Sequence, residues 1–348
     1  MLFPSALTEV GIRSRGICEQ ESSAMPAVFR EVSAAAGVDE GATPFPGMIV
    51  SVGGSNIARL AGGKGLRLQA PPMLKIEELP SIPAMLTALL ASFNLASLPN
   101  PGAPGDARYF RISGSVPIGP RPVQVKAVGA GRSKPEAVLD VAVLKRRKVK
   151  LSIRPVQVNA PQGGLVFHSK KPFDTNAMVE QMNSIWTPQA NVAFELVSSD
   201  PAQIVDGAEI AKMLDLKTSK EASLPSMVVL QRFADVFKRL KDKGADLTMF
   251  LVESVGDLND PRFLYSHAKR VDGITDSALG ISLIGDARTS QRELMAHEAG
   301  HFIGSRVGRD GKFMVFGHRG GTRDLMQDGG SDTARIPFHD AIDFFNRP

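Results

Sequence analysis

The sequence predicts a mixed α/β protein in which a smaller β-rich domain precedes a larger domain with a partly parallel sheet. Residues 44–147 hold short apolar runs set between Gly, Pro and Asn, a pattern typical of small β-rich domains. From residue 148 to residue 348, strand-like and helix-like segments alternate, which favours a layered α/β domain with some parallel strands. Residues 1–43 form an N-terminal segment that we expect to be weakly structured or helical.

The composition is that of a folded protein with a moderate positive charge. The 348 residues are 43% hydrophobic and 22% charged, and the formal net charge is +5. Much of the excess lies in residues 145–150, where the absence of interleaved aromatic residues favours a solvated strand edge over a nucleic-acid arm. We therefore expect no nucleic-acid partner. The single cysteine, Cys18, excludes an internal disulfide and leaves histidine and carboxylate as zinc ligands.

Targeting and membrane signals are weak. Glu9, Arg13 and Arg15 interrupt the stretch in which a signal peptide keeps an apolar core, so we expect a cytoplasmic protein or one exported without a classical leader. Residues 82–98 are the most apolar window, but Pro83 and Asn94 interrupt them and they are short for a bilayer. We interpret them as a buried helix inserted into the β-rich domain, and we expect no membrane span.

The N-terminal part is predicted to contain one short helix and several strands. The helix is expected over residues 25–38, and the strands are expected in GMIVSVG, GLRLQA, ARYFRISGSV, RPVQVKAVG and AVLDVAVL. Residues 51–68 combine clustered glycines with Lys64, as a phosphate-binding loop does. Because Gly65 follows Lys64 where such a loop has Ser or Thr, we interpret these glycines as turn residues.

The C-terminal part alternates between the two kinds of element. Strands are expected in KVKLSIRPVQV, NVAFELVSS and LTMFLVESV, with an edge strand and its approach loop in GITDSALGISLIGD. Helices are expected in FDTNAMVEQMNSIWTPQ, capped by Asp174 or Thr175, in the polar stretch 226–246, and in SQRELMAHEAGHFIGSR. The last of these carries a capping box at Ser290 and Glu293 and ends near Gly304.

The chemistry-bearing pattern is HEAGH, residues 297–301. On a helix His297 and His301 lie one turn apart and project from the same face, so that both imidazoles can reach one zinc ion. Glu298 lies beside them, where it can touch a metal-bound water as a general base. The alternative is a helix with two surface histidines and a chance glutamate. Because no glutamate follows Glu298, a site completed by a downstream glutamate is excluded.

These residues resemble the signature of the metzincins, zinc endopeptidases with the motif H-E-x-x-H-x-x-G-x-x-H followed by a Met-turn. His297, Glu298, His301 and Gly304 match in order, whereas Val307 occupies the position of the third histidine. We interpret this departure as an insertion of about ten residues, after which Gly317 and His318 return to the metal. His318 precedes Met326 by eight residues, an interval similar to that of matrix-type members.

The resemblance covers roughly residues 148–348, where the order of strands and helices is similar to that of the family's N-terminal subdomain. It implies one catalytic Zn²⁺ ion on His297, His301 and His318, with Met326 beneath it in a Met-turn. Asp324 is the alternative third ligand, because GGTRD resembles the G-T-x-x-D motif of aspzincins but is one residue short. A tyrosine that some members place after the Met-turn is missing. His339 is expected on a terminal helix, and His168 and His267 in structural or solvent roles.

The implied function is hydrolysis of peptide bonds by a metal-activated water, with Glu298 as general base and a protein or peptide as substrate. The substrate is expected to lie extended beside the edge strand in ALGISLIGD, residues 278–286. The alternative is a binding protein or secreted effector with a structural or degenerate metal site. The intact Glu298 argues against it, because a structural zinc site needs no general base. The sequence predicts neither the cleavage preference, nor the role of residues 1–147, nor the oligomeric state.

Overall fold

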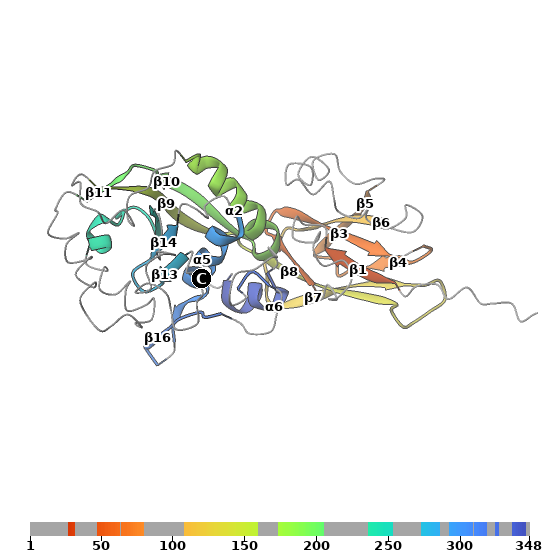
Figure 1. Ribbon diagram of the computed structural model, residues 1–348. Helices are drawn as coiled ribbons and strands as arrows, with labels where there is room; N and C mark the ends of the chain where they lie inside the picture. Colours follow the sequence, from red (N-terminus) through yellow and green to blue (C-terminus); the bar gives the residue numbers. More distant parts are fainter. Residues whose placement is uncertain are drawn as a thin grey trace, which may run out of the picture.

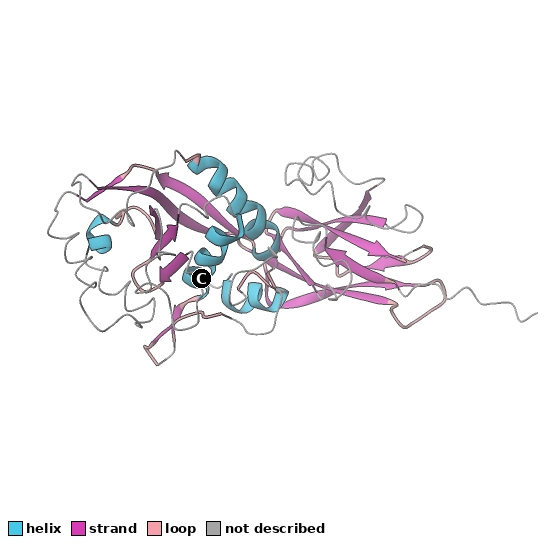
Figure 2. Ribbon diagram, in the orientation of Figure 1, coloured by secondary structure: helices cyan, strands magenta, loops and turns pink. Residues whose placement is uncertain are grey.

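In the described part of the chain the strands gather into several sheets, and the helices lie in the C-terminal half, on and beside the sheet that contains β9 and β10 (Figures 1 and 2). The structure is a computed structural model. It describes residues 27–31, 47–62, 64–79, 108–158, 173–204, 236–252, 273–285, 292–308, 310–318, 324–326 and 336–345. Within these residues the architecture is mixed α/β.

The N-terminal part is a sandwich of two four-stranded sheets. One sheet has the spatial order β1 (Val28–Glu31), β3 (Gly54–Ala61), β6 (Arg108–Gly114) and β5 (Leu74–Leu79). The other has the order β2 (Gly47–Ser51), β8 (Ala137–Leu144), β7 (Ile118–Val128) and β4 (Arg67–Gln69). Alternate residues of both sheets face inward, and the core between them contains Phe29, Leu60, Ile112, Leu139 and Val141.

One prediction for this part is wrong and two strands, β3 and β5, were not predicted, because packing decides these elements. The helix expected over residues 25–38 is instead strand β1 at residues 28–31, which pairs antiparallel with β3 and buries Phe29 in the sandwich. Strand β5 was not predicted, since Lys75, Glu77 and Glu78 make its sequence look like a polar loop. The helix expected over residues 82–98 lies outside the described residues.

The glycine-rich segment 51–68 contains a strand and its turns. Strand β3 runs through its middle and pairs antiparallel with both β1 and β6. Gly53 and Gly65 have φ values of 74° and 75°, in the left-handed region that favours glycine. The interpretation of these glycines as turn residues is confirmed.

The C-terminal part is built on a six-stranded mixed sheet. Its strands are β10 (Val192–Ser198), β9 (Arg147–Val158), β12 (Leu247–Val252), β14 (Ile281–Gly285) and β13 (Gly273–Asp276), in this order, with β11 (Ala202–Ile204) also paired to β9. Pairing is parallel throughout among strands β9, β10, β11, β12 and β14. Strand β13 runs antiparallel to β14. Central strand β12 is buried along its whole length, as expected of a strand covered on both faces.

The edge of this sheet differs from the one expected. Residues 278–286 were expected to form the edge strand, but β14 within them is an inner strand that hydrogen-bonds on both sides. The edge position belongs to β13, reached through the tight turn at Gly280, whose φ is 63°. The five residues of β14 are all buried and apolar or small, which fits an inner strand better than an edge.

Helix α2 (Thr175–Ala190) forms where a helix was expected, in FDTNAMVEQMNSIWTPQ, and it packs against β10 and against the helix that carries HEAGH. Asp174 is its N-cap, because a side-chain oxygen accepts a hydrogen bond from Ala177 N at 3.0 Å. Asn191 ends it in the left-handed conformation, with φ 53°. Its buried face includes Met182, Ile185 and Trp186.

The remaining elements are α5 (Arg292–Gly304), the hairpin β15 (Arg306–Val307) and β16 (Phe313–Met314), and a terminal helix made of α6 (Phe338–Asp340) and η5 (Ala341–Phe345). Residues 236–240 are also helical, and the rest of the helix expected over 226–246 lies outside the described residues. No helix in the described part of the chain is long and apolar enough to cross a membrane.

The sandwich continues directly into the second core. Ile49 and Ala142 lie on the outer face of β2 and β8 and belong to the same apolar cluster as Trp186 and Phe338. Asn56 Nδ2 donates to Pro188 O at 2.9 Å across this contact. The short link from β8 to β9 therefore joins two parts that also pack on each other.

Arg147 departs from the expectation that residues 145–150 are a solvated strand edge. Its guanidinium donates from Nη1 to Ile303 O at 3.0 Å and to Phe345 O at 2.8 Å, at the carboxyl ends of α5 and η5. Burial lowers its pKa, and the charge of Asp246 opposes this. Arg147 therefore ties the first residue of β9 to the end of the helix that carries HEAGH. Lys145, Arg146, Lys148 and Lys150, in contrast, are exposed.

Candidate metal centre

Helix α5 carries the HEAGH motif into the core. His297 is 8% exposed and Glu298 4%, while Ala296 and Ala299 on the same turns belong to the apolar cluster. Trp186 Nε1 donates to Ala296 O at 3.1 Å and fixes the helix to α2. A chance pair of surface histidines beside a glutamate does not describe this helix. A buried carboxylate and a buried imidazole need partners that justify removing them from water.

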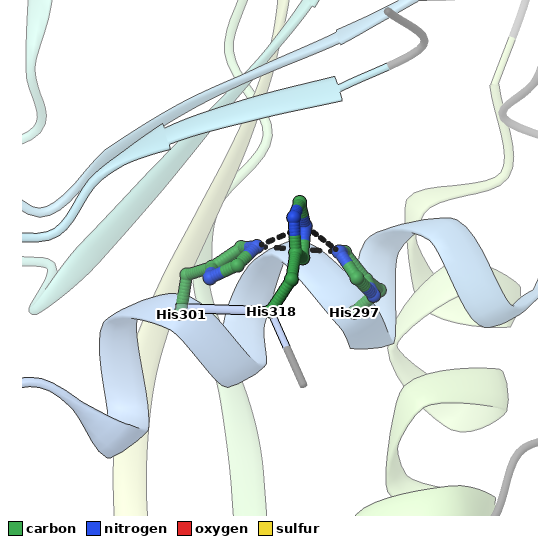
Figure 3. A group of neighbouring side chains, drawn as sticks. All are labelled: His297, His301 and His318. Atoms are coloured by element: carbon green, nitrogen blue, oxygen red, sulfur yellow. Dashed lines mark hydrogen bonds between the residues drawn. The ribbon is translucent and has the colours of Figure 1, made fainter. Parts of the chain in front are cut away.

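The three histidines expected as ligands meet at one point. The Nε2 atom of His297 lies 3.2 Å from that of His301 and 3.1 Å from that of His318, and the third separation is 3.2 Å. His297 and His301 project from one side of α5, and the His318 ring stands between them (Figure 3). Among the described residues these three histidines form the group able to hold a metal ion. In a tetrahedral site with 2.0–2.1 Å bonds, neighbouring ligand atoms are about 3.3 Å apart, close to the separations found.

The hydrogen bonds of the Nδ1 atoms determine the tautomers of His297 and His301, and therefore whether their Nε2 atoms can bind a metal ion. His297 Nδ1 lies 2.5 Å from Leu325 O, and His301 Nδ1 lies 2.7 Å from Phe316 O. Carbonyl oxygens only accept hydrogen bonds, so both Nδ1 atoms carry the proton and both Nε2 atoms of the neutral rings present lone pairs. Two lone pairs 3.2 Å apart repel each other unless a cation lies between them. The donor set therefore fits a metal ion better than it fits mutual hydrogen bonds.

The protonation of His301 points the same way. Burial lowers the pKa of His301, and its hydrogen bond to Phe316 O opposes the shift. The ring is therefore neutral at neutral pH, which is the form that binds a metal.

The segment that brings His318 back is held against the end of α5. Ser305 Oγ donates to His301 O at 2.6 Å and accepts from Phe316 N at 2.8 Å, so one hydroxyl joins the helix to the returning chain. The Phe316 ring packs beside Phe344 and Phe345, with ring centroids 5.0 Å away in each case. The segment between His301 and His318, where an extra loop was expected, therefore contains an anchored β-hairpin made of β15 and β16.

Met326 and Asp324 lie beneath the same helix. Met326 is 2% exposed, and a Cβ atom added to Gly300 would collide with its sulfur. Met326, the residue expected in a Met-turn, thus packs directly against Gly300 of the HEAGH turn. Asp324, the alternative ligand, is buried and accepts from Met326 N at 2.8 Å through Oδ1. Its carboxylate holds the turn and does not belong to the cluster that the three histidines form.

Glu298 is held by the edge strand. Thr275 Oγ1 of β13 lies 2.6 Å from Glu298 Oε2 and donates to it, and Ser282 Oγ lies 2.7 Å from the same threonine oxygen. Gly273 allows this approach, since a Cβ there would lie 2.6 Å from Glu298 Oε1. Burial raises the pKa of Glu298 to about 7, while the Thr275 hydrogen bond and the nearby His318 lower it. A carboxyl with a pKa near 7 can both take and return a proton at neutral pH.

Sequence reasoning missed two residues of this arrangement, Thr275 and Ser305. Thr275 lies in a four-residue strand far from the motif, and only the pairing of β13 beside α5 brings it to Glu298. Ser305 directly follows α5, so a hydroxyl at the end of a metal-binding helix was the available signal. His339 is exposed on α6, as expected, and His168 and His267 lie outside the described residues.

No protein-family model and no curated protein matches this sequence.

We expect Gly304 to be required for the chain after α5 to fold back and place His318 beside His297 and His301. A Cβ atom at Gly304 would lie 2.5 Å from Phe316 Cγ and 2.8 Å from Phe316 Cβ, and Phe316 is pinned on its other side by two phenylalanine rings. Gly304→Ala should therefore lower the stability by about 1–3 kcal/mol through overpacking. Thermal unfolding measures this. Gly317→Ala is the matched control, because a Cβ there meets no atom within 4 Å; equal stability of the two variants would contradict the argument.

Ser305→Ala is expected to weaken metal binding about tenfold to a hundredfold, as loss of an outer partner of a ligand does. The reason is that Phe316 N loses its acceptor, so the segment leading to His318 loosens. Competition against a chromophoric zinc chelator measures the affinity. Ser277→Ala is the control, since Ser277 Oγ also donates to His301 O, at 2.9 Å, whereas the Phe316 N–H donates to Ser305 Oγ. A similar loss in both variants would show that the helix carbonyl, not the returning segment, matters.

Proposed function

We propose that this chain is a zinc-dependent endopeptidase with a metzincin-like site, in which His297, His301 and His318 hold one Zn²⁺ ion and Glu298 is the general base. The observation that carries the proposal is the triangle of three Nε2 atoms, two of which are forced to present lone pairs, next to a buried glutamate on the same helix turn. Among the described residues no fourth side chain joins the three imidazoles, and three protein ligands are the composition of catalytic zinc sites, which keep a position open.

Zinc in such a site supplies a Lewis acid that acidifies water and polarises a carbonyl. The protein's own contribution begins with Glu298, which accepts a proton from the attacking water and later delivers it to the leaving amine. Thr275 orients the Glu298 carboxylate through Oε2, and Ser282 supports the threonine hydroxyl. The carbonyl oxygens of Leu325 and Phe316 hold the two helix histidines in the tautomer that leaves Nε2 free to coordinate.

The substrate is proposed to lie extended along β13, the observed edge of the sheet. This strand packs beside α5 and pairs on one side with β14, so its other backbone edge faces away from the sheet. An extended peptide can add to such an edge by main-chain hydrogen bonds. Val307 at the expected position of the third histidine does not argue for a degenerate site here, because the inserted hairpin places His318 against His297 and His301.

Turnover that depends on the metal tests the proposal. The full chain is dialysed against a chelator, and cleavage of casein and of a quenched-fluorescence peptide library is measured before and after zinc is restored. We expect activity to vanish with the metal and to return with about one zinc per chain. A protein that binds one zinc tightly and cleaves neither substrate would instead be a binding protein with a structural metal site.

A further inference from the structure

The inserted hairpin between the second and third ligands presents apolar side chains to solvent. Val307 is 66% exposed, Phe313 41%, Met314 45% and Val315 59%. These are four of the eight large hydrophobic residues that are exposed in the described part of the chain, and they fall within nine consecutive positions. A run of three exposed apolar residues such as 313–315 is unusual in a soluble protein unless it serves binding.

The strand pairing puts part of this set on one face. Val307 lies directly opposite Phe313 in the β15–β16 ladder, so their side chains share a face, and Val315 follows two residues after Phe313. We name Val307, Phe313 and Val315 the hairpin strip. Phe316, in contrast, turns into the core against Gly304.

The hairpin is built firmly enough to act as a fixed surface. Gly308 N donates to Lys312 O at 2.6 Å and Gly311 N to Gly308 O at 3.0 Å, and Gly311 takes a φ of 76° at the turn. At its base, Ser305 and Phe316 join it to α5. The strip therefore has a fixed position relative to the three histidines.

The strip is close to the metal along the chain. Val315 precedes His318 by three residues, so their Cα atoms are within about 11 Å of each other. An extended peptide covers that distance in about three residues. A polypeptide whose scissile bond lies at the histidines can therefore reach the strip with a side chain about three residues away.

We propose that the hairpin strip binds apolar side chains of an extended polypeptide substrate, so that the centre selects chains with a large apolar residue within about three residues of the bond presented to the metal. This inference rests on the proposed peptidase function and adds a substrate class to it. A second copy of the chain is a poorer occupant, because three side chains are far fewer than the 20–30 residues per partner of a stable interface. A peptide needs only a few such contacts.

The test measures peptide binding apart from cleavage. In zinc-loaded Glu298→Gln protein, fluorescence anisotropy compares two peptides of equal length and charge, one with central Leu and Phe and one with Ser and Gly in their place. We expect the apolar peptide to bind at least tenfold more tightly. Adding Val307→Ser, Phe313→Ser and Val315→Ser should abolish this difference, a loss of about ten- to hundredfold for the apolar peptide.

Controls separate the strip from general apolar exposure and from folding. Val138→Ser with Val197→Ser removes two exposed valines from β8 and β10, and should leave binding unchanged. Zinc content and thermal unfolding of the strip variant should match those of its parent, because all three residues are exposed.

The outcomes distinguish the peptide-binding role of the hairpin strip from the proposed peptidase function. If apolar peptides bind through the strip but the wild-type protein does not cleave them, the peptidase function is wrong and the binding role of the strip is kept. Cleavage of both peptides at equal rates, unaffected by the strip variant, would retain the peptidase and overturn the strip. Strip-dependent sedimentation with phosphatidylcholine–phosphatidylglycerol vesicles, with no change in peptide selectivity, would overturn it in favour of a membrane contact.

Discussion

His318→Ala is expected to lower zinc affinity by more than about a hundredfold, beyond the usual effect of losing an outer partner of a ligand. His318 supplies one of the three clustered Nε2 atoms, and the two left on α5 form an incomplete site. The fold should survive, since the His318 side chain is exposed and outside the apolar core. Zinc per chain after dialysis, together with competition against a chelator, gives the result.

Two variants make this measurement specific. His339→Ala removes an exposed histidine on α6 that does not belong to the three-histidine cluster, and it should leave the zinc content unchanged. Asp324→Asn keeps an oxygen for Met326 N while removing the charge of the alternative ligand. If zinc is retained by His318→Ala and lost by Asp324→Asn, the third ligand is Asp324 and the interpretation of the hairpin as an insertion is wrong.

The helix half of the centre could be predicted from the sequence because its information is local. His297 and His301 are four residues apart, and a helix that keeps this spacing sets their rings side by side whatever surrounds it. His318 is different. It lies seventeen positions after His301, beyond the hairpin of β15 and β16, and no periodicity specifies where such a chain returns. Its prediction depended on the resemblance to a family in which a histidine follows at a set interval before a methionine.

The parts that could not be predicted depend on contacts between distant segments. The apolar residues of β14 predict a strand, and an edge position was expected for it. Whether a strand lies at the edge or inside a sheet depends on which other strands pair with it. Phe29 lies in a strand because β3 is there to pair with it, although its neighbours have helical propensity. Thr275 reaches Glu298 for the same reason, through the placement of β13 beside α5.

Glu298→Gln is expected to lower kcat for hydrolysis by about a hundredfold to ten-thousandfold while zinc stays bound. The amide has the size of the carboxylate and its oxygen can still accept from Thr275 Oγ1, so the three histidines should keep their places. It cannot take a proton from water, however, and a neutral group is easier to bury at a site that already raises the pKa of Glu298 to about 7. Stability should therefore not fall. Glu293→Gln, in the first turn of the same helix, controls for charge loss along α5 and should retain turnover. Full activity of Glu298→Gln at unchanged zinc content would mean that the proton leaves through another group, and the role assigned to the buried glutamate would be lost with it.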